Sequence, residues 1–195
     1  MPRYIPGKRS ALFEKLGLCF GWIFHDGHAY LIFTEQNGHR VAEALLQDKE
    51  ISAEEAQALK DEITKQGLAA NINVIIEHAK AVPASDKSLQ KVTFKLCSEP
   101  ECGFKEHGLP HAWICYDDEE KGAFSVEEAL MILFKLDRIE EDQNPLGPDD
   151  ATRIIVEAAN QGLLPEYIDV ENHLKDLDPG TARVMRIIML RIQDR

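Results

Sequence analysis

The sequence predicts an α+β fold made of two related units that arose by internal duplication, followed by a C-terminal helix. Three observations lead to this prediction: a β-hairpin pattern that occurs twice, helix signals after each hairpin, and short matches between the two halves of the chain. We expect the first unit over residues 1–82 and the second over 83–178, with an acidic insert near 137–147. The C-terminal helix, over 179–195, is expected to pack across the units.

The first hairpin is predicted over residues 16–33. There "LGLCFGWIF", "HDG" and "HAYLIF" place aromatic and β-branched residues on both sides of an Asp-Gly pair. This pair supplies the positive φ angles that a two-residue hairpin turn requires. In the second unit "KVTFKLC" and "HAWICY" are predicted as two strands, joined by a longer and more irregular connection.

Helices are predicted after each hairpin. The capping-box spacing of a helix start occurs twice, in Ser52 with Glu55 and in Ser125 with Glu128. Glycines suited to a helix C-terminus follow at Gly67 and Gly162. A third segment comes next in each unit; residues 165–177 favour a helix, whereas residues 70–81 are compatible with either helix or strand.

Short matches indicate the duplication itself. "HAYL" at 28–31 matches "HAWI" at 111–114, "VAEAL" at 41–45 matches "VEEAL" at 126–130, and "QGL" at 66–68 recurs at 161–163. The separation between matches grows along the chain, as two insertions in the second copy would produce. The alternative is chance similarity between segments that are both rich in helix.

The C-terminal segment "PGTARVMRIIMLRIQDR" has no counterpart in the first copy. Its residues Val184, Ile187, Ile188 and Arg191 recur at helical spacing, and its methionines broaden the apolar face. Such breadth predicts burial between two surfaces. These surfaces are either the seam between the two copies, which is the simpler interpretation, or a dimer contact.

Charge and hydropathy restrict the function. The net charge is −12, with 9 basic and 11 acidic residues over 1–82 and 13 basic and 23 acidic residues over 83–195. An acidic surface repels phosphate backbones, so we do not expect nucleic-acid binding. No apolar run approaches the ~18 residues of a membrane span, and no Sec signal peptide is recognisable. We therefore expect a cytoplasmic protein, bacterial in general character, with specialised export left open.

One cluster has the residue types that zinc prefers. Its most plausible ligand set is Cys97, Cys102, His107 and His111. The spacing lacks the Cys-x2-Cys pair of familiar structural sites, and the first copy contains a single cysteine, so both copies cannot hold the same site. Cys115 lies four residues beyond His111 in a predicted strand, ~13 Å away, and is excluded from the set. A structural histidine is the simpler interpretation of His111.

Two other chemistries have weaker support. A thiolate nucleophile could be drawn from the four cysteines with a histidine as base, but no family signature marks one of them. The acidic stretch "DRIEEDQNPLGPDD" does not keep the order of oxygen ligands found in an EF-hand, so a solvated loop is expected there rather than a calcium site.

These observations favour a non-enzymatic protein–protein interaction or adaptor protein with an acidic surface. The alternatives are a structural zinc-binding module that uses Cys97, Cys102, His107 and His111, and a Cys-His dependent hydrolase or transferase. We expect no cofactor in the leading interpretation and zinc in the second. A protein partner is expected, whereas its identity and the oligomeric state are left open.

Overall fold

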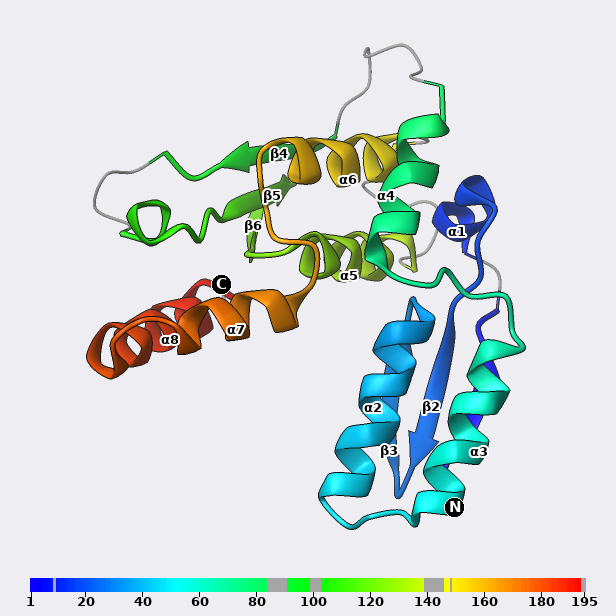
Figure 1. The fold of residues 1–195 in the computed structure, drawn as a ribbon. Coiled ribbons are helices and arrows are strands. Elements are labelled where there is room, and N and C mark those ends of the chain that lie inside the picture. Colours follow the sequence, from blue (N-terminus) through cyan, green and yellow to red (C-terminus); the bar gives the residue numbers. More distant parts are fainter. Residues whose placement is uncertain (9, 84–90, 99–102, 139–145, 148, 194–195) are drawn as a thin grey trace. The chain divides into compact units, whose positions relative to one another are not determined.

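The computed structural model describes residues 1–195 except 9, 84–90, 99–102, 139–145, 148 and 194–195. The chain divides into two compact units, Met1–His78 and Ala79–Arg195. Each unit contains a three-stranded antiparallel sheet followed by helices (Figure 1), which confirms the predicted α+β fold class. Most of the expected acidic insert lies outside the described residues.

Unit 1 begins with a strand, a short helix and a hairpin, and continues with three helices. In chain order its elements are β1 (Arg3–Pro6), α1 (Ala11–Leu16), β2 (Gly21–His25), β3 (His28–Ile32), α2 (Glu35–Gln47), α3 (Ala53–Thr64) and α4 (Ile72–Ala81). Helices α2 and α3 lie over one face of the sheet (Figure 1), where they enclose a core with Ile23, Ile32 and Ile63. The segment at 70–81, for which strand and helix were both open, is helical.

Unit 2 repeats this order and adds one helix. Its elements are β4 (Val92–Leu96), the 3₁₀ helix η3 (Lys105–His107), β5 (Ala112–Tyr116), β6 (Glu119–Ala123), α5 (Val126–Asp137), α6 (Asp150–Asn160), α7 (Tyr167–Lys175) and α8 (Pro179–Gln193). The strand β6 was not predicted, because its sequence "EEKGA" has little strand character.

The turns and helix ends follow the sequence signals. Asp26 and Gly27 have φ angles of 44° and 80°, as a two-residue hairpin turn requires. Ser52 and Glu55 form the predicted capping box, and the Ser125 hydroxyl accepts a hydrogen bond from the Glu128 amide. Local chemistry of this kind is readable from the chain because both partners lie within a few residues of each other.

The repeat is present, but in a register different from the one that the short matches predict. "HAYL" forms β3, whereas "HAWI" enters β5, the middle strand of its sheet, which corresponds to β2. The pair that truly corresponds is therefore "FGWI" at 20–23 with "HAWI" at 111–114, a separation of 91 residues. The match of "VAEAL" with "VEEAL" is also wrong, because the first lies inside α2 and the second begins α5.

Backbone contacts establish the corrected register. Thr34 forms a parallel bridge with Ala69, and Ser125, 91 residues after Thr34, forms one with Leu164. In both units the residue that follows this serine or threonine donates its amide to the bridge partner's carbonyl, at 2.9 Å. The separation rises from 91 to 95 residues within the helices, where the predicted match of "QGL" with "QGL" is correct, with positive φ at Gly67 and Gly162.

The third helix after the hairpin carries a histidine at the corresponding position in each unit. His78 of α4 contacts the carbonyl of Leu16 at 2.8 Å, and His173 of α7 contacts the carbonyl of His107 at 2.6 Å. Each carbonyl belongs to the last residue of the short helix between the first two strands. Because a carbonyl only accepts, each imidazole donates, and both histidines close the end of a short helix.

Candidate functional site

The three described members of the predicted zinc set, Cys97, His107 and His111, lie on different segments of unit 2. Cys102 lies outside the described residues, so the four-residue set stands as a prediction. The amide of Cys97 donates to the carbonyl of His111 at 2.9 Å, which places these two residues opposite each other just beyond the β4–β5 pair. His107 is exposed at the end of η3. Within the described part of the chain, no three histidine, cysteine or carboxylate residues come together as a metal site.

His111 belongs to a buried aromatic cluster. Its ring stacks on Phe124 with centroids 5.0 Å apart and meets the edge of Phe104 at 5.3 Å. Only 2% of the residue is exposed, and burial lowers the pKa of the imidazole to about 4. The ring is therefore neutral near pH 7.

Unit 1 explains this cluster. There Phe13 contacts Phe20 at 5.1 Å and Phe33 at 5.4 Å. The three phenylalanines each precede their counterparts, Phe104, His111 and Phe124, by 91 residues. His111 thus takes the place of a core phenylalanine, which supports the structural interpretation of this histidine.

The described cysteines do not share one environment. Cys19 is exposed, whereas Cys97 and Cys115 are partly buried. The Cys115 thiol donates to the Glu120 carboxylate at 3.6 Å, and burial raises its pKa although the Lys95 ammonium opposes the shift. Burial therefore disfavours the thiolate form of Cys115, the form that nucleophilic catalysis uses.

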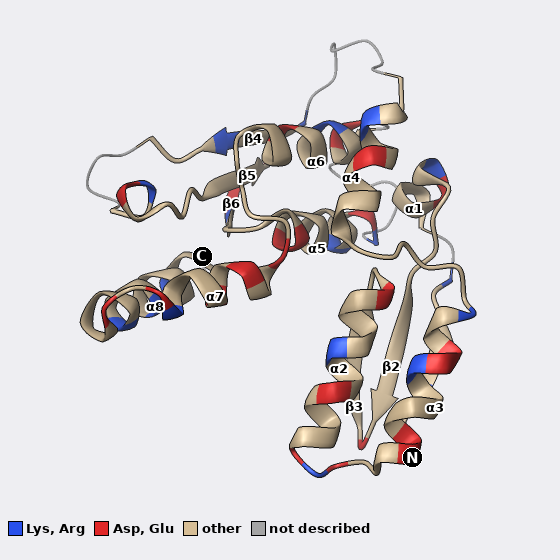
Figure 2. Cartoon of the chain, in the orientation of Figure 1, with Lys and Arg blue, Asp and Glu red and all other residues tan. Residues whose placement is uncertain are grey.

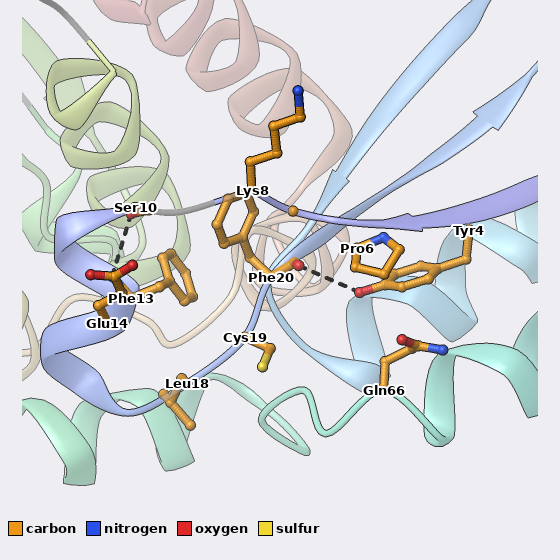
Figure 3. A pocket seen from close by; sticks show the side chains of 11 residues that line it. Tyr4, Pro6, Lys8, Ser10, Phe13, Glu14, Leu18, Cys19, Phe20 and Gln66 are labelled. Atoms are coloured by element: carbon orange, nitrogen blue, oxygen red, sulfur yellow. Dashed lines mark hydrogen bonds between the residues drawn. The ribbon is translucent and has the colours of Figure 1, made fainter.

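A cavity of about 210 Å³ lies in unit 1 between the start of the chain and the α1–β2 connection (Figure 3). Glycine allows two rings to pack closely in this region: a Cβ on Gly21 would overlap the Tyr4 ring, and one on Gly7 would overlap the Phe20 ring. The Tyr4 hydroxyl donates to the Phe20 carbonyl at 3.5 Å, and burial raises its pKa to about 12. This cavity was not predicted, because its lining residues between Tyr4 and Phe20, joined by Gln66, surround a hollow only once the chain has folded.

The lining of the cavity offers little chemistry. Figure 3 shows the Cys19 thiol at its edge and the Lys8 side chain extending away from the Tyr4 ring. A tyrosine whose pKa lies at about 12 is a poor base near pH 7. We therefore treat the cavity as a small, mostly apolar recess.

The most unusual surface lies on α8. One face of this helix is buried through Ala182, Met185 and Met189, which join the core of unit 2. At its end a Cβ on Gly122 of β6 would overlap Ile192, and the Gln193 amide donates to the Glu128 carboxylate. Helix α8 is therefore fixed to its own unit through one face.

The opposite face is apolar as well. Val184 is 55% exposed, Ile187 44%, Ile188 36% and Leu190 59%. Arg183 and Arg191 are exposed beside them. We call these six residues the α8 outer face. The predicted breadth of the apolar surface is thus present, but half of it is open to solvent.

No helix in the described residues is long and apolar enough to cross a membrane. Comparison of the chain with family models, with curated proteins and with solved structures found no match.

Proposed function

We propose that this protein acts by binding another protein through the α8 outer face, as a non-enzymatic interaction or adaptor protein. One observation carries the proposal: among the described residues, four of the six exposed large hydrophobic side chains lie on this one helix. Single exposed aliphatic residues are ordinary on protein surfaces, whereas a contiguous group of them is typical of an interaction site.

The energetics favour this interpretation over a structural one. Because α8 is already anchored by Ala182, Met185 and Met189, its outward aliphatic residues contribute little to the fold of unit 2. Covering a half-exposed aliphatic side chain stabilises a complex by about 1 kcal/mol, so four of them are worth roughly 4 kcal/mol at the centre of an interface. An apolar centre of this size, surrounded by polar contacts at the edge of the interface, suits a complex of moderate affinity.

Chemistry elsewhere in the chain supports the same choice. In the described residues the buried histidine has a structural explanation, and the cavity in unit 1 is small and mostly apolar. The remaining surface is acidic, in keeping with the net charge of −12. Repulsion between like-charged molecules disfavours non-specific self-association of such a protein.

Site-specific photocrosslinking tests the proposal. A photoreactive amino acid is placed at Ile187 of the full chain, in the cells that produce the protein, with Glu54 of α3 as an exposed control position. We expect one defined protein adduct from position 187, lost when Leu190→Glu is added, and no such adduct from position 54. Identical adducts at both positions, or none at 187, would contradict the proposal.

A further inference from the structure

We infer that the partner segment that binds the α8 outer face is an acidic amphipathic helix, with two carboxylates about two helical turns apart and aliphatic side chains between them. This inference rests on the proposed function and names the chemistry of the partner.

The charge of α8 differs from that of the chain as a whole. The helix Pro179–Gln193 carries three arginines and no aspartate or glutamate, although the chain as a whole is acidic. Figure 2 shows the contrast with α7, where acidic residues occur. Arg186 is already occupied by an ion pair with Glu171 of α7, at 3.1 Å. Arg183 and Arg191 have no ion-pair partner among the described residues.

The spacing of Arg183 and Arg191 along α8 matches the spacing of residues on a second helix. Arg183, Ile187 and Arg191 follow one another at intervals of four residues, so they form one line along the helix. Eight residues of helix place the two arginine Cα atoms ~12 Å apart, with the aliphatic residues between and beside them. A second helix that packs along α8 presents matching positions seven or eight residues apart. Its carboxylates would reach the two arginines while its aliphatic residues cover Ile187.

Two other occupants fit the α8 outer face less well. A second copy that packs α8 against α8 would bring arginines to arginines, because the described helix contains no carboxylate to pair with them. An anionic bilayer is the poorer occupant because the face exposes only Arg183 and Arg191, whereas segments that bind anionic lipids carry about 4–8 basic residues. The outer face also lacks the tryptophan or phenylalanine typical of helices that lie on membranes. An acidic helical segment satisfies both the aliphatic residues and the arginines.

A charge-reversal titration tests the inference. Two synthetic helical peptides share leucines at positions i+3 and i+4, and carry either glutamates or lysines at positions i and i+7. We expect the full-length protein to bind the glutamate peptide at least tenfold more tightly than the lysine peptide. The R183E/R191E variant should reverse this preference, whereas R183K/R191K should keep its direction. Both substituted positions are exposed, and R183Q/R191Q, which should abolish the preference, serves if the reversal variant does not fold.

Several results would overturn the inference. These are equal binding of both peptides, binding of neither, or a preference that survives R183E/R191E. Dimerisation that depends on Ile187, or binding to phosphatidylserine vesicles in place of the glutamate peptide, would assign the face to another occupant. If the crosslink at position 187 persists while the charge preference is absent, the partner class is wrong but the proposed function stands. Loss of the crosslink alone instead removes the proposed function.

Discussion

The buried imidazole of His111 makes the stability of unit 2 depend on pH. Burial lowers the pKa of this residue to about 4 in the folded protein, from an ordinary value of 6.5. As the pH falls below 6.5, the unfolded chain takes up a proton that the folded unit refuses, so stability decreases down to pH 4 and is constant below it. Linkage gives a loss of about 2 kcal/mol at pH 5 relative to pH 8, and about 3 kcal/mol in full.

His111→Phe removes this titration and restores the ring found at Phe20 of unit 1. The substitution has a steric cost, because the position opposite Phe20 is Gly7, where a Cβ would overlap the ring. In unit 2 that position is Cys97, so the single variant is overpacked by about 1–3 kcal/mol at pH 8. The double variant C97G/H111F recreates the pair of unit 1 and should recover most of this cost.

Hydrogen exchange measures both effects within one unit. The amides of β5 and β6 are followed at pH 8 and pH 5, with rates corrected for intrinsic exchange, and those of β2 and β3 serve as control. We expect wild-type β5 and β6 to lose about 2 kcal/mol of protection, and both phenylalanine variants to lose far less. If H111F and wild type lose equal protection between pH 8 and pH 5, the pH dependence does not come from His111. If C97G/H111F is no more stable than H111F at pH 8, the steric argument is refuted.

Three further substitutions test the packing of unit 2. Gly122→Ala forces a Cβ into Ile192, so we expect unit 2 to lose about 1–3 kcal/mol of stability. The loss of hydrogen-exchange protection should be greatest in the amides of α8. Unchanged protection there would contradict the packing of this helix on β6. Arg153→Met removes the cation 2.7 Å from the Asp150 carboxylate, which is 4% exposed, and should lower the free energy of urea unfolding by about 2 kcal/mol. Glu157→Gln, which breaks the exposed pair of the same arginine, should change it by less than about 0.5 kcal/mol, and equal effects would contradict the role of burial.

The sequence predicted those features whose chemistry is local. The Asp26-Gly27 turn, the Ser52 capping box and the glycines at 67 and 162 each depend on neighbours a few residues away, and each is present as expected. The fold class followed from the recurrence of these signals. Strand β6 escaped prediction because its place in the sheet is fixed by pairing with β5 rather than by its own composition.

The register of the repeat could not be read from short identities. "HAYL" and "HAWI" share letters, but the positions that correspond are set by three-dimensional contacts: the ring cluster at 13, 20 and 33 recurs at 104, 111 and 124. Replacement of Phe20 by His111 conceals this relation, because a histidine is ordinarily read as chemistry. The spacing of aromatic residues, common to both units at two of the three positions, is the signal that could have revealed it.

The sequence predicted the apolar character of the C-terminal helix but not which of its residues are exposed. The apolar breadth of the C-terminal helix predicted two contacting surfaces, and one of them is the core of its own unit. Periodicity alone could not decide which residues meet that core, because Met185 and Ile187 are both large apolar residues of one helix. Only the docking of α8 on β6 separates the anchored face from the α8 outer face.

The unfolding free energy of Ile187→Glu tests the central claim that the α8 outer face is kept apolar for a partner and not for the fold. Ile187 is 44% exposed on the side of α8 away from the core. We predict a change within about 0.5 kcal/mol in the protein measured alone, at a fixed concentration below that of any self-association. A loss of more than about 2 kcal/mol would show that the folded chain itself buries this residue, and would contradict the account.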